Sequence, residues 1–208
     1  NLSCNKKLFL ADIERFRPSV ILLHEYFGFN TLKHVEDVIS EAKNLGITVI
    51  NDITQALYSR FEHVPADYYI FSFRKWSALP DGGCAISVEK PFLYKPLKID
   101  VKLQEAKTKA FHAKHLYINE NTGVKENFLK MFHDAEQILH KQQFIYAMNP
   151  ISKKLQGNLD IDFVVKKRRK NFYFLLDKLQ KSNIVDPIFK ELPETVTPLY
   201  FTVYVNCN

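Results

Sequence analysis

Short apolar runs alternate with an amphipathic segment in the first half of this chain. Residues 20–24 form one apolar run beside Pro18, and residues 47–50 form another. A helix that ends at Gly46 is predicted between them, because apolar residues recur at three- to four-residue spacing at Leu32, Val35, Ile39, Ala42 and Leu45. Two buried strands joined by a helix normally lie parallel in one sheet. The pattern therefore predicts an α/β fold with a mostly parallel sheet.

Two more strands and two long helices are predicted further along the chain. The strands lie at residues 68–73 and 84–88, and the second is entered through a Pro-Asp-Gly-Gly turn. Helical spacing of apolar residues covers 128–139 and 161–179, and strand character returns at 198–205. The order is thus strands and helices in alternation, then long helices, then the start of further strand structure.

Composition excludes several classes of protein. Hydrophobic residues make up 46% of the 208 residues and charged residues 25%, which excludes a disordered chain. Three widely spaced cysteines, Cys4, Cys84 and Cys207, form neither a disulfide framework nor a zinc motif. The histidines have no acidic partners at metal-binding spacing, and no apolar run reaches the ~20 residues of a membrane span. We therefore expect a cytoplasmic protein with reduced thiols, no bound metal and no membrane partner.

Polar side chains follow the second and third predicted strands. Asp52 and Gln55 come after one strand, and Ser72 and Lys75 come at the end of the next. In open α/β sheets, ligands bind beyond the carboxyl ends of the strands. A lysine can form a Schiff base with an aldehyde, and a carboxylate can keep a pyridine nitrogen protonated. Together with a hydroxyl for a phosphate group, this set suits a phosphate-bearing, nitrogen-containing aromatic cofactor.

The same residues carry a resemblance to a known family. Residues 51–57, 66–76 and 80–83 read NDITQAL, ADYYIFSFRKW and PDGG. This series of Asp-x-x-Gln, Ser-Phe, lysine and Gly-Gly resembles the DegT-type (DegT/DnrJ/StrS) sugar aminotransferases, which are fold type I pyridoxal-phosphate enzymes. The short spacing from the Ser-Phe pair to the lysine resembles a divergent branch. The resemblance covers most of the chain, and it is most specific from Asp52 to Gly83.

The resemblance implies a fold and a domain order. Residues 1–150 would be part of a pyridoxal-phosphate-binding large domain with a mostly parallel sheet. Residues 151–208 would contain a bridging helix and the start of a small α+β domain. The family has a further segment before this region and more of the small domain after it. We therefore expect the chain to be an internal fragment of a longer enzyme.

The resemblance also implies roles for individual residues. Lys75 would be the Schiff-base lysine and proton shuttle, and Asp52 would pair with the pyridinium nitrogen. Gln55 would contact the ring or its 3-hydroxyl, and Ser72 would bind the phosphate. The substrates would be a nucleotide-linked keto sugar and an amino-acid amino donor, in a homodimer whose products feed polysaccharide or amino-sugar biosynthesis.

Two other functions are compatible with the sequence. One is a non-catalytic protein on the same pyridoxal-phosphate fold, with a binding or regulatory role. The other is nucleic-acid binding through the basic run at 166–170, Lys-Lys-Arg-Arg-Lys. A solvated helix face is the preferred interpretation of that run, because no base-stacking aromatic pattern accompanies it. The formal charge of +6 would then serve to attract anionic nucleotide sugars.

Overall fold

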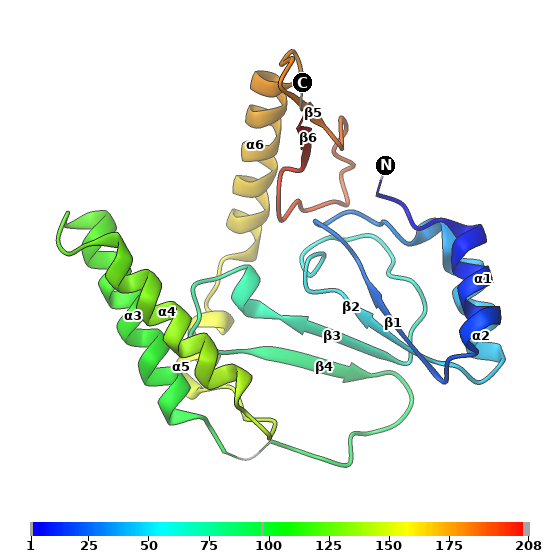
Figure 1. Ribbon diagram of the computed structural model, residues 1–208, viewed down its shortest axis with the longest axis horizontal. Helices are drawn as coiled ribbons and strands as arrows, with labels where there is room; N and C mark the ends of the chain where they lie inside the picture. The colour runs from blue at the N-terminus through cyan, green and yellow to red at the C-terminus, as the bar shows by residue number, and fades with distance from the viewer. Residues whose placement is uncertain (1, 97, 206–208) are drawn as a thin grey trace. The chain divides into compact units, whose positions relative to one another are not determined.

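The computed structural model describes residues 2–96 and 98–205, so the Cys207 thiol lies outside the described residues. Six α-helices, two 3-10 turns and six strands follow one another along this part of the chain (Figure 1). Their order is α1 Lys6–Phe16, β1 Val20–His24, η1 Lys33–Val35, α2 Glu36–Asn44, β2 Thr48–Asp52, β3 Tyr68–Ser72, η2 Phe73–Lys75, β4 Gly83–Ser87, α3 Val101–Asn119, α4 Lys125–His140, α5 Pro150–Gly157, α6 Ile161–Leu179, β5 Val185–Pro187 and β6 Val203–Val205.

Strands β1 to β4 form a four-stranded sheet with the order β1-β2-β3-β4. Strand β2 pairs in parallel with β1, from Thr48 opposite Val20 to Asp52 opposite His24. It also pairs in parallel with β3. Strand β4 runs antiparallel to β3, because Phe73 N donates to Gly82 O at one end and Val88 N to Asp67 O at the other. The prediction of an α/β fold with a mostly parallel sheet is therefore confirmed.

The described chain divides into two compact units. Unit 1 consists of Asn1–Phe71, Ala85–Pro91 and Asp160–Asn208, and unit 2 consists of Ser72–Cys84 and Phe92–Leu159. Unit 1 thus groups α6 and the strands after it with the first three strands. The predicted division into domains 1–150 and 151–208 refers to a whole enzyme and stays a prediction.

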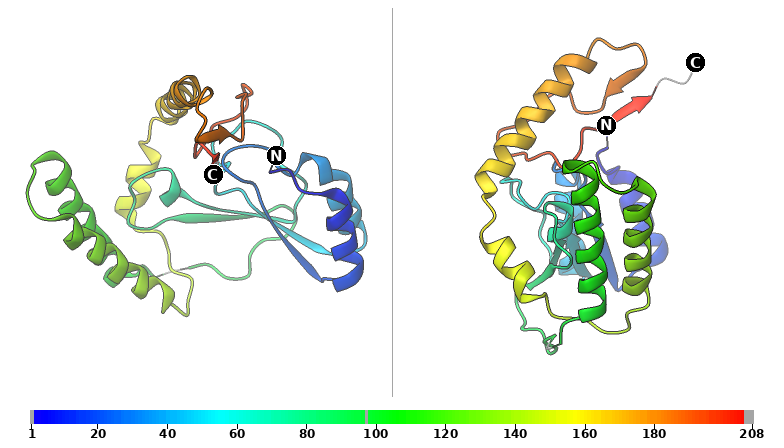
Figure 2. Two further views of the ribbon diagram at one scale, coloured as in Figure 1. Left: turned by 45° about the horizontal axis from the view of Figure 1, so that its top comes forward. Right: turned by 90° about the vertical axis from the view of Figure 1, so that its left-hand side faces the viewer.

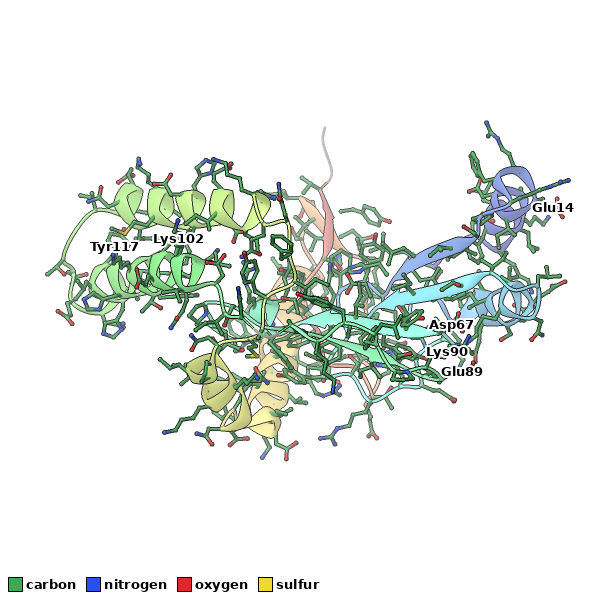
Figure 3. All side chains as sticks on the ribbon, turned by 90° about the horizontal axis from the view of Figure 1, so that it is seen from below. Glu14, Asp67, Glu89, Lys90, Lys102 and Tyr117 are labelled. Atoms are coloured by element: carbon green, nitrogen blue, oxygen red, sulfur yellow. The ribbon has the colours of Figure 1, made fainter. Side chains whose placement is uncertain are left out.

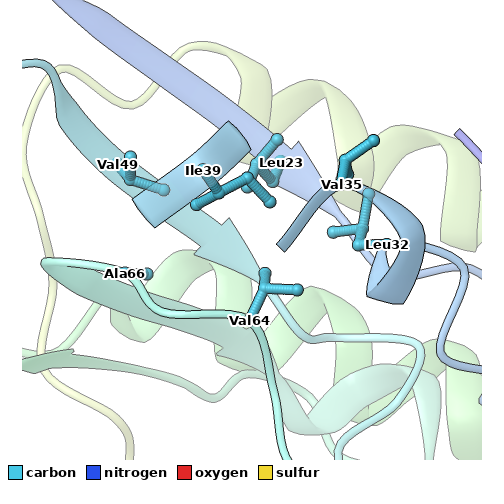
Figure 4. Packing of buried hydrophobic residues seen from close by; sticks show 7 residues of the cluster. All are labelled: Leu23, Leu32, Val35, Ile39, Val49, Val64 and Ala66. Carbon is cyan, nitrogen blue, oxygen red and sulfur yellow. The ribbon is translucent and has the colours of Figure 1, made fainter. Parts of the chain in front are cut away.

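The core of unit 1 lies between α2 and the strands β1 and β2. Its buried members are Leu23, Leu32, Val35, Ile39, Val49, Val64 and Ala66 (Figure 4). The apolar face predicted for the helix is buried as expected at Leu32, Val35, Ile39 and Ala42. Leu45 is the exception, with 72% of its surface exposed, because α2 ends at Asn44 and Leu45 follows as its cap. The apolar spacing therefore predicted a buried face that extends one residue beyond the end of the helix.

Unit 2 contains an antiparallel pair of helices. Helices α3 and α4 lie side by side along their length (Figures 1 and 2). Aromatic rings fill the seam, with Phe111 and Phe132 5.0 Å apart between ring centroids and Tyr117 and Phe128 5.3 Å apart. No helix of the described residues is both long and apolar enough to cross a membrane.

The predicted strand at 198–205 is shorter in the structure, where only Val203–Val205 pairs with β5. The reason is that the preceding backbone is hydrogen-bonded elsewhere. Leu199 N donates to Phe27 O at 2.9 Å, and Leu199 O accepts from Arg168 Nη1 at 2.8 Å. Apolar side chains nearby complete a second cluster in unit 1, formed by Phe29, Phe172, Leu192 and Val196.

Gly28 lies against this C-terminal segment. Its φ is +95°, and a Cβ at this position would collide with the carbonyl oxygen of Thr197. Ser59 ties the same two stretches together, because Ser59 Oγ donates to Gly28 O at 2.7 Å and accepts from Thr197 N at 3.0 Å. The loop after β1 and the segment around Thr197 can approach this closely only because residue 28 has no side chain.

Gly28→Ala should therefore destabilise the chain far more than Gly46→Ala. Both glycines have positive φ, but nothing lies within 4 Å of a Cβ at Gly46. We expect a loss of about 1 kcal/mol in the free energy of unfolding for Gly46→Ala, from backbone strain alone. For Gly28→Ala we expect roughly 3 kcal/mol, from strain plus the clash. Urea denaturation of the two variants measures the difference, and equal losses would show that the contact with Thr197 is unimportant.

Candidate cofactor site

Asp52 is the last residue of β2, and its half-buried carboxylate is held on both oxygens. Thr54 N donates to Oδ1 at 2.9 Å, and His24 Nδ1, at the end of β1, lies 3.2 Å from Oδ2. Burial raises the pKa of the Asp52 carboxyl, but the hydrogen bonds from His24 and Thr54 outweigh it and leave the pKa below its usual value. At neutral pH the structure thus presents an ionised carboxylate at the end of a central strand.

Gln55 lies in the turn after Asp52, and its side chain stabilises the loop that follows β1. Its Oε1 accepts a hydrogen bond from Phe27 N at 2.9 Å. Phe27 has a φ of +62°, a left-handed conformation that a bulky residue rarely adopts without support from its surroundings. Because the oxygen of the Gln55 amide is used here, its nitrogen is the group that can donate to a ligand.

A buried polar network beside this turn was not found from the sequence. Glu25 is fully buried, and its carboxylate accepts from Asn51 Nδ2 at 2.8 Å and contacts His63 Nδ1 at 2.7 Å. Asn51 precedes Asp52 in β2. A buried carboxylate is tolerated only when its oxygens have partners. No local pattern in the sequence could have paired residues 25 and 63, which lie far apart along the chain.

Ser72 and Lys75 belong to unit 2, where β3 ends and η2 begins. The Ser72 hydroxyl donates to Gly82 O at 3.5 Å, a long hydrogen bond. Gly82 has a φ of +128° and leads directly into β4. Lys75 is exposed on η2. The predicted Gly-Gly turn is thus present only in part: Gly82 ends the loop that follows η2, whereas Gly83 is already the first residue of β4, which runs antiparallel to β3.

Arg74, the residue before Lys75, is held by charged side chains on helices α3 and α4. Arg74 Nη2 lies 2.7 Å from Glu136 Oε1 of α4, and Lys107 Nζ of α3 contacts the same oxygen. The Lys107 side chain is only 4% exposed. Burial raises the pKa of the Glu136 carboxyl, but hydrogen bonds and charges from Lys107 and Arg74 bring it below its usual value. Glu136 therefore neutralises two cations, one of which is adjacent in sequence to Lys75.

The structure places the four predicted site residues in two pairs. Asp52 and Gln55 lie together in unit 1 at the end of β2, and Ser72 and Lys75 lie together in unit 2 at the end of β3. Each pair is positioned by its own contacts, as described above. Their convergence on one ligand stays a prediction.

The basic run of α6 has structural contacts in the described chain. Arg168 Nη1 donates to Leu199 O, and Arg169 Nη1 donates to Pro193 O at 2.7 Å and also contacts Val196 O. Burial lowers the pKa of the Arg168 guanidinium. Two of the five basic residues thus hold the C-terminal segment of unit 1 onto α6, which weakens the interpretation of the run as a nucleic-acid-binding surface.

A polar pocket of about 180 Å³ lies at the opposite, amino-terminal ends of β2 and β3. Asp67, Glu89 and Lys90 gather there (Figure 3). Asp67 accepts from Val49 N at 2.7 Å and pairs with Lys43 at 3.0 Å, so its carboxylate has a structural role. Within the described residues, no group of three or more histidine, cysteine or acidic side chains could hold a metal ion.

Comparisons with known proteins include a solved structure that is similar to this chain. No family model matches the sequence, and no curated protein matches it. The sugar aminotransferase CalS13 from Micromonospora echinospora has a similar structure, with a TM-score of 0.48 and 16% sequence identity. The similarity covers 90% of this chain and 48% of that one. This chain thus spans about half the length of that aminotransferase.

The hydrogen bonds of Asp52 predict a pH-dependent contribution to stability. Because its pKa is lower in the folded chain than in the unfolded one, the contribution is complete well above about pH 3.9 and is lost as the pH falls through the folded value. We expect Asp52→Asn to lower the free energy of unfolding by about 1 kcal/mol at pH 7. The difference in the free energy of unfolding between Asp52→Asn and the unmodified chain, measured by urea denaturation, should become progressively smaller below about pH 5. A difference in unfolding free energy that does not change with pH would contradict a stabilising role for the ionised Asp52 carboxylate.

Glu136→Gln should destabilise unit 2 because it leaves the buried Lys107 ammonium without its counter-charge. We expect a loss of about 2 kcal/mol in the free energy of unfolding, since breaking a buried pair costs several kcal/mol and Glu136 is partly exposed. Asp134→Asn is the matched control, because Asp134 pairs on the same helix with the exposed Lys130 and should contribute less than about 0.5 kcal/mol. Similar losses in both variants, measured by denaturation, would refute the role given to Glu136.

Proposed function

We propose that this chain is part of a pyridoxal-phosphate-dependent aminotransferase that acts on a nucleotide-linked keto sugar. The observation that carries the proposal is the ionised, half-buried carboxylate of Asp52 at the carboxyl end of a central parallel strand. The neighbouring strand ends at Ser72, three residues before Lys75. Beyond that lysine a glycine turn leads into an antiparallel strand. The motifs that resemble the DegT-type enzymes occupy these same positions.

The chemistry of the residues fits the cofactor. Asp52 offers an anionic acceptor for a protonated ring nitrogen, and the His24 and Thr54 contacts hold that acceptor in place. The Gln55 amide nitrogen can donate to the ring 3-hydroxyl, since its oxygen already accepts from Phe27 N. The Ser72 hydroxyl can donate to the phosphate in place of its long hydrogen bond to Gly82 O.

The roles of the protein side chains follow from these positions. When bound, the cofactor supplies an aldehyde and an electron-withdrawing ring. Lys75 would hold the cofactor through its amine, which condenses with the aldehyde and releases water, and the same amine, when free, would move a proton at the α-carbon of the amino donor. Asp52 keeps the ring nitrogen protonated. Lys75 is exposed on the short 3-10 turn η2, so its amine is accessible from solvent.

The remaining parts of the proposal concern partners. The substrates are an amino-acid donor and a nucleotide-linked keto sugar, and the complete enzyme is a cytoplasmic homodimer. A role in nucleic-acid binding is not proposed, because Arg168 and Arg169 bind the chain's own carbonyl groups.

Covalent capture of the cofactor tests the proposal on the purified chain. Incubation with pyridoxal phosphate should give a visible absorption band, and borohydride should fix the cofactor to one lysine. Peptide mass spectrometry should find the reduced adduct on Lys75. Lys75→Arg should abolish the band, because a guanidinium does not form the bond, whereas Lys90→Arg should leave it unchanged.

Two outcomes would contradict the proposal in different ways. An adduct spread over many lysines, and unaffected by Lys75→Arg, would show that the chain has no cofactor site at Lys75. A specific adduct on Lys75 in a complete enzyme that exchanges no amino groups between amino acids and keto sugars would favour the alternative, a non-catalytic protein on the same fold.

A further inference from the structure

Helix α6 has two faces of different character. On its inner face Phe172 is buried, and Arg168 and Arg169 donate to backbone carbonyl groups of the C-terminal segment of unit 1. Its outer face is exposed and combines lysines with phenylalanines, namely Phe163, Lys166, Lys167, Lys170, Phe174 and Lys178. The packing of unit 1 therefore accounts for the inner face of α6 and leaves the outer face unexplained.

The two phenylalanines of the outer face lie on the same side of the helix. They are eleven positions apart, which is about three turns, and Phe163 is 59% and Phe174 60% exposed. A lysine four positions further on lies over each ring, with Lys167 Nζ 6.0 Å and Lys178 Nζ 5.9 Å from the ring centroid. The same pair of an apolar ring and a cation thus occurs twice along one exposed line of α6.

Three lysines in the middle of the outer face have no acidic partner. They are Lys166, Lys167 and Lys170, and none of them forms an ion pair within the described part of the chain. The acids of the helix are engaged elsewhere, because Asp162 pairs with Arg60 at 2.9 Å and Asp177 pairs with Lys178 at 3.4 Å. The middle of the outer face is therefore positively charged and attracts an anionic surface.

A lipid bilayer fits this face better than a nucleic acid does. Phenyl rings cannot form hydrogen bonds with base edges, and the arginines that could do so, Arg168 and Arg169, bind the chain's own carbonyl groups. Single strands bind along charged grooves, whereas the outer side of one helix is convex. An anionic bilayer accepts both kinds of side chain, since its phosphates neutralise lysines and its acyl boundary accepts aromatic rings.

We infer that the outer face of α6 binds the surface of an anionic lipid bilayer. The helix lies along the surface, with Phe163 and Phe174 inserted among the lipids and the three central lysines against the headgroup phosphates. The sequence predicts no membrane partner because it lacks a spanning run, but a helix that lies on the surface needs no such run. This binding goes beyond the proposed function and does not depend on the cofactor site.

Co-sedimentation of the purified chain with lipid vesicles tests the inference. We expect binding to vesicles of phosphatidylserine and phosphatidylcholine, weaker binding at high salt, and no binding to vesicles of phosphatidylcholine alone. The triple variant Lys166→Gln, Lys167→Gln and Lys170→Gln should bind about a hundredfold more weakly, since each lysine near an anionic surface contributes about fivefold. The matched control changes three exposed lysines of α3 to glutamine, Lys102, Lys109 and Lys114, and should keep most of the affinity because it alters only the net charge.

Fluorescence tests whether the rings enter the bilayer. Phe174→Trp should show a blue-shifted emission when phosphatidylserine vesicles are added, because its indole leaves water. Phe16→Trp on α1 is the matched control, since Phe16 is 64% exposed and also lies beside a cation, Arg15, at 4.9 Å. The emission of Phe16→Trp should not shift. The native Trp76 is buried and gives the same background in both variants.

Several results would overturn the inference. They are equal binding to both kinds of vesicle, equal losses of affinity in the two triple variants, and an unshifted emission of Phe174→Trp on phosphatidylserine vesicles. Binding of a single-stranded oligonucleotide by a chain that does not bind vesicles would assign the face to nucleic acid instead. None of these results concerns the capture of pyridoxal phosphate by Lys75, so the proposed function stands or fails separately.

Discussion

Strand β2 pairs with β1 along one edge and with β3 along the other, and the candidate site depends on this double pairing. A strand held on both edges has its backbone hydrogen bonds satisfied inside the sheet, so its end is fixed in direction. Asp52 is at that end and is placed opposite His24 by the register of β1 and β2. The contact with His24, which holds the Asp52 carboxylate and helps to lower its pKa, is therefore a consequence of strand register.

The loop after β1 is held from two sides of unit 1. Gln55 accepts from Phe27 N, while Phe27 O accepts from Leu199 N of the C-terminal segment. Gly28 lets this segment come close, and Arg168 and Arg169 tie it to α6. Gln55, which is predicted to bind the cofactor, thus also has a structural role. Two residues of the basic run, Arg168 and Arg169, likewise contribute to the packing of the chain. Tight support of this kind is what a site needs to hold its side chains in place.

Apolar periodicity predicted the parts of the fold that local sequence determines. Strand β1 and the buried face of α2 follow directly from the spacing of their side chains. The strand predicted at 198–205 was mostly wrong because Leu199 bonds to Phe27, more than 170 positions away, and such partners leave no local pattern. For the same reason the pairs Glu25–His63 and Arg74–Glu136 were not predicted. Motif spacing indicated Asp52 and Lys75, but it could not show what supports them.

We propose that Asp52 and Lys75 act on one cofactor, and the protonation state of the cofactor's ring nitrogen tests this proposal most directly. Pyridoxal phosphate labelled with nitrogen-15 in the ring would be bound to the chain and observed by NMR at neutral pH. We expect a protonated nitrogen in the unmodified chain and loss of that proton in Asp52→Ala, with the covalent link to Lys75 kept in both. A nitrogen signal that is identical in the two proteins would contradict the claim.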